Sequence, residues 1–128
     1  MTNTTSALNG LFKPLEGPQI SQLKTKQDDA VLSLTVASDL RWFDGHFPQQ
    51  KVLPGVVQID WAGKLAKALF VGGESFTQLT NIKFKTMVLP DTAMQLTLTH
   101  KAAKGIVAFH FFNDTDSFSQ GSFKFIAS

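Results

Sequence analysis

The sequence predicts an α+β domain in which one long helix lies against a curved antiparallel sheet. Two observations carry this prediction. Residues 56–70 form an almost wholly apolar segment that is too long for a typical strand and fits a helix. The sequence that follows consists of strand-like stretches separated by short turns, the pattern of an antiparallel meander. A chain of 128 residues suits one core, so we expect a single domain over residues 1–128.

Two strands are expected before the helix. Residues 1–10 are small and polar, which predicts a loosely held N-terminal end. Residues 20–26 alternate weakly and predict a first strand. Residues 30–37 alternate strictly, with two leucines and Val36 on one side, so this segment is expected to be a half-buried strand.

The predicted helix has a narrow polar stripe. Asp60, Lys64 and Lys67 lie together on a helical wheel, and Gln58 stands alone elsewhere. Apolar residues cover the rest, so we expect most of the helix to be wrapped by other structure. Gly72-Gly73 is the expected end of the helix.

Four strands are expected after the helix, at residues 76–88, 93–101, 106–112 and 118–126. A Leu-Pro-Asp break at residues 89–91 and two short polar or glycine-containing turns separate them. Because the turns are short, successive strands are expected to pair in order.

The composition excludes several classes of function. The absence of Cys excludes disulfides, thiol catalysis and thiolate metal sites. The N-terminus has no basic region followed by an apolar run, so no secretory signal is expected. No segment approaches the ~20 apolar residues of a membrane span. The sequence therefore predicts a cytoplasmic protein, and its mild charge of +2 does not indicate nucleic-acid binding.

Residues 42–64 bring together an imidazole, a Pro-Gly break, a helix start and a carboxylate. His46 lies in a loop rich in Gly and Pro, and Pro54-Gly55 ends that loop. Asp60 lies in the first turn of the helix or just beyond it. A helix start presents unpaired backbone N–H groups and the positive end of the helix dipole. We therefore expect a base, an anion site and an acid at one place.

Each of these features also has a purely structural interpretation. A lone loop histidine more often satisfies local hydrogen bonds than performs catalysis, and Pro54-Gly55 is also an ordinary helix start. Asp60 can form a surface pair with Lys64 at i, i+4, whereas apolar surroundings would favour its protonated, acidic form. One reaction uses all three features. His46 takes the α-proton of a thioester, the amide of Gly55 and its neighbours holds the enolate-like oxygen, and Asp60 protonates a departing β-hydroxyl.

The run FDGHFPQQKVLPGVVQIDWA resembles the signature of the β-hydroxyacyl-acyl carrier protein dehydratases of fatty acid synthesis, which have the hotdog fold. His46 matches the catalytic histidine of that family, and Asp60 matches its helix carboxylate at the same spacing. Gly55 matches the glycine whose amide holds the thioester carbonyl. The later run NIKFKTMVLPDT resembles the family's strand and turn, and the resemblance extends over residues 31–125.

This resemblance implies an assembly and a partner. In the family the sheet wraps a central helix and two protomers pair, so each site would join His46 of one subunit to Asp60 of its mate. A homodimer or a hetero-oligomer with a homologue is therefore expected. The substrate would be carried on the 4'-phosphopantetheine of an acyl carrier protein, with no metal or other cofactor. Phe47, Pro54 and Val56 would lie around the thioester and acyl chain.

The sequence also departs from the family pattern. Lys51 stands where the family has Pro, and Met87 and Asp91 replace Pro and Gly in the later turn. Lys64 replaces a common Gln, and a lysine there favours the ionised form of the neighbouring carboxylate. Trp61 replaces a small residue and is expected to narrow the acyl tunnel. These departures indicate a divergent member, and the run VVQIDWA is similar to dehydratases of the aryl-polyene type.

Basic residues offer a possible contact for the carrier protein. Lys83 and Lys85 fall on one face of a predicted strand, where they are either solvated edge charges or, with Arg41 or Lys51, a contact for an acidic carrier or its phosphate. The two remaining histidines are expected to serve packing.

The sequence thus predicts a dehydratase, and two rival functions stay open. A thioesterase of the same fold would use the helix carboxylate to direct water at the carbonyl, which the His46-to-Gly55 motif argues against. A non-catalytic subunit that binds acyl chains or completes an assembly is the other rival.

Overall fold

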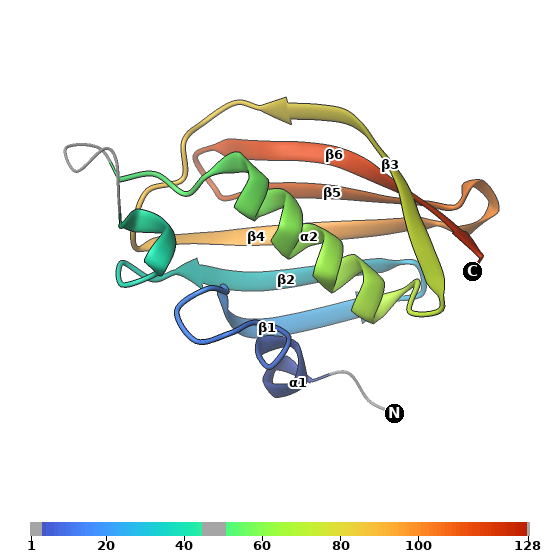
Figure 1. Cartoon of the computed structure of the whole chain (residues 1–128), viewed down its shortest axis with the longest axis horizontal. Coiled ribbons are helices and arrows are strands. Elements are labelled where there is room, and N and C mark those ends of the chain that lie inside the picture. The colour runs from blue at the N-terminus through green and yellow to red at the C-terminus, as the bar shows by residue number, and fades with distance from the viewer. Residues whose placement is uncertain (1–3, 45–50, 128) are drawn as a thin grey trace.

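The computed structural model describes residues 4–44 and 51–127. Over these residues the chain forms a six-stranded antiparallel sheet of order β1-β2-β4-β5-β6-β3, and helix α2 lies across one of its faces (Figure 1). The strands are β1 (Gln19–Lys26), β2 (Asp29–Val36), β3 (Glu74–Phe84), β4 (Thr92–Lys101), β5 (Ile106–Phe112) and β6 (Ser117–Ala127). The helices are α1 (Thr5–Asn9) and α2 (Gly55–Leu69), with 3-10 turns η1 (Arg41–Phe43) and η2 (Ala102–Lys104). The predicted α+β class is confirmed.

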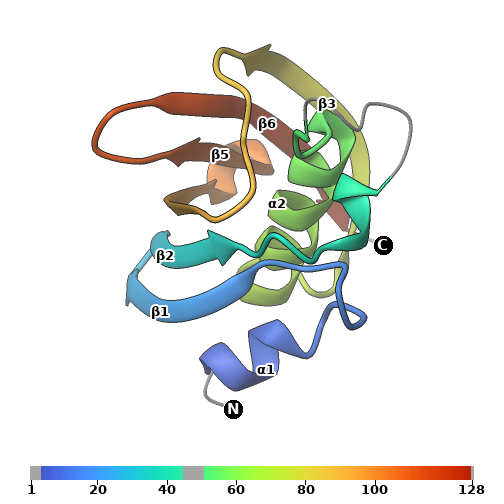
Figure 2. The ribbon, with the colours of Figure 1, turned by 90° about the vertical axis from the view of Figure 1, so that its left-hand side faces the viewer.

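The strands form where the sequence alternates. In β2 the buried positions are Ala30, Leu32, Leu34 and Val36, and the residues between them are partly exposed. The same period appears in β5, which alternates between buried and partly buried residues along its whole length. Alternation places one row of side chains on the concave face of the sheet, which curves around α2 (Figure 2).

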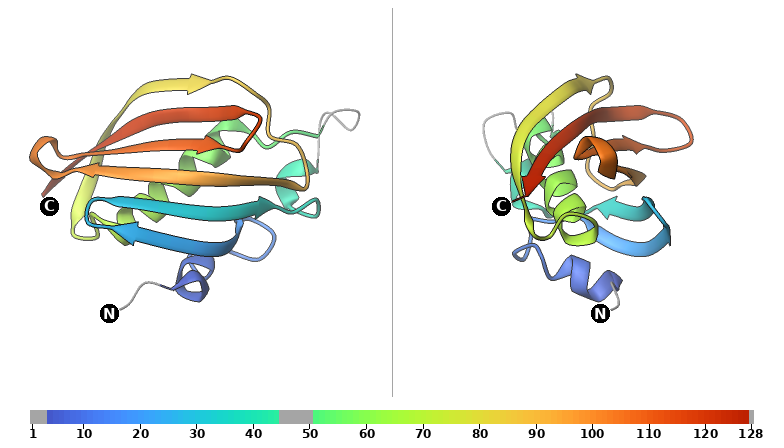
Figure 3. Two further views of the ribbon diagram at one scale, coloured as in Figure 1. Left: turned by 180° about the vertical axis from the view of Figure 1, so that it is seen from behind. Right: turned by 90° about the vertical axis from the view of Figure 1, so that its right-hand side faces the viewer.

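The predicted pairing order is correct only in part. Strands β4, β5 and β6 form a meander, but β3 pairs with β6 at the edge of the sheet and has no ladder with β4. The connection at residues 85–91 passes the ends of β6 and β5 to reach β4 (Figure 3). A short turn was the reason to expect pairing of β3 with β4. The connection instead extends along the end of the sheet, and Val88 is buried within it.

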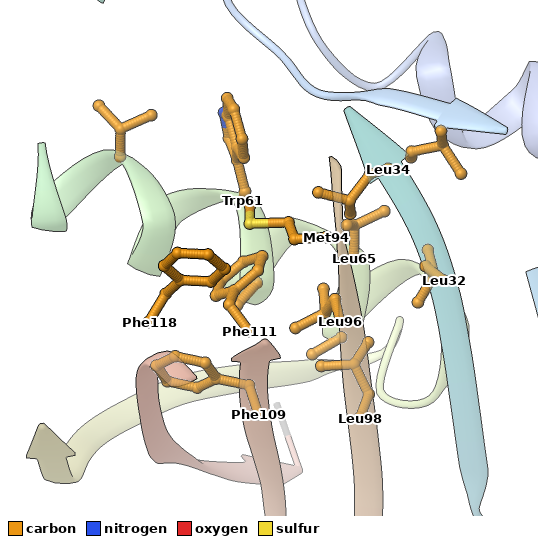
Figure 4. Packing of buried hydrophobic residues seen from close by; sticks show 14 of the residues in the cluster. Leu32, Leu34, Trp61, Leu65, Met94, Leu96, Leu98, Phe109, Phe111 and Phe118 are labelled. Carbon is orange, nitrogen blue, oxygen red and sulfur yellow. The ribbon is translucent and has the colours of Figure 1, made fainter. Parts of the chain in front are cut away.

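The core lies between the concave face of the sheet and α2. Its labelled members in Figure 4 are Leu32, Leu34, Trp61, Leu65, Met94, Leu96, Leu98, Phe109, Phe111 and Phe118, all at most 3% exposed. Helix α2 contributes the row Val57, Gln58, Trp61, Ala62, Leu65 and Ala66, which repeats at helical spacing. Each large apolar side chain buried in this way contributes about 1.5–3 kcal/mol to folding before the entropy of ordering the chain is subtracted.

The opposite side of α2 is open, which corrects the expectation that most of the helix is wrapped. Val56, Asp60, Lys64 and Lys67 are exposed, and Val56 is 74% exposed. We call these four residues the open face of α2. The helix also ends slightly earlier than predicted. Phe70 is its C-cap, and Gly72 and Gly73 lie in the turn before β3.

The N-terminal segment also differs from its prediction. A loosely held end is predicted for residues 1–10, whereas residues 5–9 form α1, whose Leu8 is only 2% exposed. The side chain of Asn9 ties α1 to β1, because its amide donates to the Ile20 carbonyl at 3.0 Å and its oxygen accepts from the Ile20 N–H at 2.9 Å. The prediction failed because the segment is polar except for a few residues, and the burial of Leu8 could not be inferred from its neighbours.

Candidate active site

The start of α2 presents backbone N–H groups that lack acceptors. Pro54 is the N-cap, and its carbonyl accepts from the N–H groups of Val57 and Gln58 at 3.1 and 3.3 Å. The carbonyl and N–H of a trans peptide point in opposite directions, so the Gly55 N–H points out of the helix end. Within the described parts of the chain, the amides of Gly55 and Val56 have no hydrogen-bond acceptor. They form a site suited to a developing negative charge.

A largely apolar cavity of about 480 Å³ adjoins these amides. Its lining includes Pro54, Gly55 and Val56 on one side and Phe84 and Met87 on the other. The Phe84 ring lies so close to Gly55 that a Cβ atom at position 55 would be 2.7 Å from two ring carbons. Glycine thus allows close contact between the helix start and the ring. An apolar wall beside free N–H groups suits a ligand with an apolar part and a polar group that accepts hydrogen bonds.

His46 and Phe47 lie outside the described residues, so their predicted roles stay predictions. The segment before them is anchored. The indole N–H groups of Trp42 and Trp61 both donate to the Glu16 carbonyl, at 2.7 and 3.0 Å. The chain at Trp42, a few residues before His46, is therefore fixed to Glu16, which lies ahead of β1.

Asp60 lies on the open face of α2 and is not part of the cavity lining described above. Its side chain is 53% exposed, and its carboxylate is 3.2 Å from the Lys64 ammonium. Of the two interpretations of Asp60 that the sequence leaves open, the structure of the chain on its own shows the surface i, i+4 pair with Lys64. Asp60 borders a second groove, of about 270 Å³, between α2 and Phe76 of β3. Ile59 borders both hollows and separates them.

Trp61 lies elsewhere than predicted. It is fully buried, its ring packs edge-on against Phe12 at 6.4 Å between centroids, and its indole bonds to the Glu16 carbonyl. The side chain points away from the cavity at the helix start, since that lining is formed by other residues of α2. A tunnel-narrowing role is not supported by this position.

The basic residues differ in their surroundings. Lys85 is exposed at the cavity, whereas Lys83 is exposed on β3 and outside that lining. The Arg41 guanidinium is paired with the Glu16 carboxylate at 2.7 Å, so it is engaged within the chain. Lys85 is thus the best placed of the three for an anionic group at the cavity.

His110 occupies a packed position on β5. Its Nε2 is 2.8 Å from the Ser117 hydroxyl, and its ring stacks on Phe112 at 4.9 Å between centroids. Partial burial, and then the ammonium of Lys85, lower the pKa of His110 from its usual value.

Gln58 is a residue whose position the prediction overlooks. It is only 3% exposed, it borders the cavity, and it accepts a hydrogen bond from the Ser119 hydroxyl at 2.7 Å. Its signal was present in the sequence, as a lone polar residue on the apolar side of the helix.

In residues 4–44 and 51–127 no cluster of three or more His, Cys, Asp or Glu side chains could hold a metal, and no helix is long and apolar enough to cross a membrane.

Comparisons with known proteins identify a family. The sequence model of a family described as ApeI-like, ApeI dehydratase, matches residues 22–122. The dehydratase heterocomplex ApeI:P from Xenorhabdus doucetiae contains a chain that is 33% identical, with a TM-score of 0.79 over 84% of this chain and 96% of that one. An uncharacterized protein from Erwinia carotovora subsp. atroseptica is also 33% identical, with a TM-score of 0.73 over 84% and 92% of the two chains.

Two further matches are more distant, one found by sequence and one by structure. The 3-hydroxyacyl-[acyl-carrier-protein] dehydratase FabZ of Streptococcus pneumoniae is 28% identical over 67% of this chain. The match spans 66% of the length of that curated relative. The dehydratase domain of the CurF module of curacin polyketide synthase, at 16% identity and a TM-score of 0.67, shows likeness of fold alone. Together these matches confirm the predicted hotdog fold.

Proposed function

The chain belongs to the ApeI-like dehydratase family, and from this premise we propose that it removes water from 3-hydroxyacyl thioesters to give trans-2-enoyl thioesters. The observation that carries the proposal is the pair of unpaired amides, Gly55 and Val56, beside an apolar cavity. An acyl chain fits the cavity, and the amides suit the oxygen of its thioester.

The proposed reaction proceeds by proton transfer. His46 takes a proton from C2 of the substrate, and the electrons of that C–H bond move toward the thioester carbonyl. The amide of Gly55 stabilises the negative charge on the carbonyl oxygen. The C2–C3 double bond then forms as the C3–O bond breaks, and Asp60 donates a proton to the departing hydroxyl. The products are water and the trans-2-enoyl thioester. Transfer of the proton from His46 to Asp60, directly or through solvent, then restores the starting protonation states.

The position of Asp60 supports a site completed by a second subunit. Its carboxylate is on the open face of α2, and β3 presents an unpaired edge of the sheet beside that face (Figure 1). A second hotdog subunit placed here would cover Asp60 and bring to it a histidine that corresponds to His46. The ApeI:P complex is described as a heterocomplex. We therefore propose a related chain as the partner, with pairing of two identical copies as the alternative outcome.

The proposed substrate is attached to an acyl carrier protein through phosphopantetheine. Lys85 is exposed at the cavity and can meet the phosphate or an acidic side chain of the carrier. The acyl chain is proposed to be of a polyene type, aryl chains included, because the run VVQIDWA is similar to dehydratases of the aryl-polyene type.

Mass spectrometry of carrier-bound 3-hydroxyacyl substrates tests this function. Chains of several lengths, including aryl ones, are incubated with the wild type, with His46→Ala, with Asp60→Asn and with the control Asp39→Asn, each alone and with a related hotdog chain. We expect loss of water with the wild type and with Asp39→Asn. The first two variants are expected to show none on their own, and with the related chain present they should lose the site to which the altered residue belongs. Release of the free thiol without loss of water would instead identify a thioesterase. Full activity of His46→Ala would show that the proposed mechanism is wrong.

A further inference from the structure

Two buried polar side chains meet beside the cavity. Gln58 is 3% exposed and Ser119 is fully buried, and within the described residues they are the only buried polar side chains. The Ser119 hydroxyl donates to Oε1 of Gln58 at 2.7 Å, and Nε2 of Gln58 donates to the Leu53 carbonyl at 3.3 Å. The chain of hydrogen bonds thus runs from β6 through α2 to the loop that precedes Gly55.

These bonds fix the backbone just before the helix start. The Leu53 N–H donates to the Val88 carbonyl at 2.8 Å, so both polar backbone groups of Leu53 are held. Pro54 follows with a φ restricted by its ring, and its carbonyl is held by the N–H groups of Val57 and Gln58. Hydrogen bonds within the chain therefore fix the direction of the Gly55 N–H before any substrate binds.

We propose that Gln58 is a positioning residue for the anion site, which it aligns through the Leu53 carbonyl. The inference rests on the proposed function and adds to it the group that orients the donors. Donors that are fixed before the substrate arrives stabilise developing charge without reorganisation, and small displacements reduce that effect strongly. Gln58 is not proposed to touch the reacting atoms.

A merely structural role predicts a different outcome. Apolar residues would fill the same space without needing partners, and replacing both members of a buried hydrogen-bonded pair by apolar groups can leave stability nearly unchanged. The double variant Gln58→Leu/Ser119→Ala removes the bond to Leu53 and leaves no buried polar side chain without a partner. The buried Leu53 carbonyl loses its donor, so some loss of stability is expected and a core variant is needed as the control.

The test compares this double variant with the wild type, with Ser119→Ala and with the core variant Leu32→Val, which lies on β2. We expect kcat for dehydration to fall about 10- to 100-fold in the double variant while KM stays within about twofold. Ser119→Ala, which loosens Gln58 and leaves its bond to Leu53, is expected to give a smaller fall. Leu32→Val is expected to keep kcat at a comparable loss of thermal stability. A kcat within about twofold of the wild type in the folded double variant would overturn the proposal.

A second readout does not depend on activity. The ¹⁵N–¹H resonances of Gly55 and Val56 are recorded without substrate. We expect shifted resonances in the double variant and in Ser119→Ala, and no shift in Leu32→Val. Unchanged resonances in both variants would also overturn the proposal. Failure of the wild type to dehydrate any substrate would refute the proposed function, and the amide measurements would still decide whether Gln58 orients this loop.

Discussion

The carboxylate of Asp60 lies 3.2 Å from the ammonium of Lys64, one helical turn further along the open face of α2. Both side chains are about half exposed, at 53% and 51%. A carboxyl that is to donate a proton must first leave this ion pair. The second subunit that we propose on the open face would change the surroundings of this pair.

We therefore expect Lys64→Gln to raise kcat for dehydration. The increase should be at most about fivefold, because an exposed ion pair of this kind contributes under about 1 kcal/mol. Lys67→Gln is the matched control, since Lys67 is also exposed on this face but forms no ion pair with a described residue. A fall in kcat with Lys64→Gln alone would show that the ammonium assists the reaction.

Trp61 is expected to matter for stability and not for substrate binding. Trp61→Phe removes the bond to the Glu16 carbonyl and part of a fully buried ring system. We expect a loss of about 1–3 kcal/mol in the free energy of unfolding, with an unchanged KM. Ile59→Ala is the comparison. Ile59 borders the cavity, so this substitution is expected to raise KM. Denaturant unfolding and steady-state kinetics measure the two effects, and a raised KM in Trp61→Phe would place the indole in the acyl site after all.

Local periodicity made much of the fold predictable. The alternation in β2 and the long apolar run of α2 each determine an element from neighbouring residues alone. The pairing of β3 with β6 was not predictable in this way, because it depends on how residues 85–91 cross the end of the sheet. A pattern within one strand carries no information about which strand lies beside it.

In the candidate site, too, some features were predictable from neighbouring residues and others depend on the fold. Pro54 and Gly55 have a local signature, and the structure places them at the start of α2 beside the cavity. The sequence left two interpretations of Asp60 open, because apolar residues on a helix do not reveal whether the chain's own sheet or a second subunit covers them. The contact between Gln58 and Ser119 joins residues far apart in the sequence, so only the folded chain shows it.

The close contact between Gly55 and Phe84 predicts a measurable coupling. A methyl group at position 55 would meet two carbons of the Phe84 ring at 2.7 Å, so the half-exposed ring must turn outward in Gly55→Ala. In the Phe84→Ala background there is no ring to displace. We expect Gly55→Ala to be about 1 kcal/mol more destabilising in the presence of Phe84 than in its absence. Chemical denaturation of the four proteins of this cycle gives the coupling energy, and a value near zero would contradict the close packing.

Reversal of the charge at Lys85 should weaken the use of carrier-bound substrate. Lys85→Glu is expected to raise KM for an acyl carrier protein substrate by about tenfold, because a repulsive charge then faces an acidic carrier or its phosphate. Lys26→Glu, on the distant edge strand β1, is the matched control and should have no effect. The same kinetics are measured with the acyl group on a short pantetheine thiol. This comparison separates contacts of Lys85 with the carrier protein from contacts with its phosphopantetheine. An unchanged KM for Lys85→Glu with normal folding would remove Lys85 from the proposed carrier contact.

His110 predicts how stability changes with pH. Partial burial and the Lys85 ammonium lower the pKa of His110 in the folded chain below its ordinary value of 6.5. The unfolded chain therefore binds this proton more readily, so the contribution of His110 to stability is present above about pH 6.5 and is lost as the pH falls through the folded pKa. We expect the melting temperature of His110→Gln to fall less than that of the wild type between about pH 7.5 and 5.5. Lys85→Gln should reduce the difference only in part, since burial is the larger cause. Equal pH dependence in the wild type and His110→Gln, measured by thermal melts in buffers of matched ionic strength, would show that the proton on His110 does not affect folding.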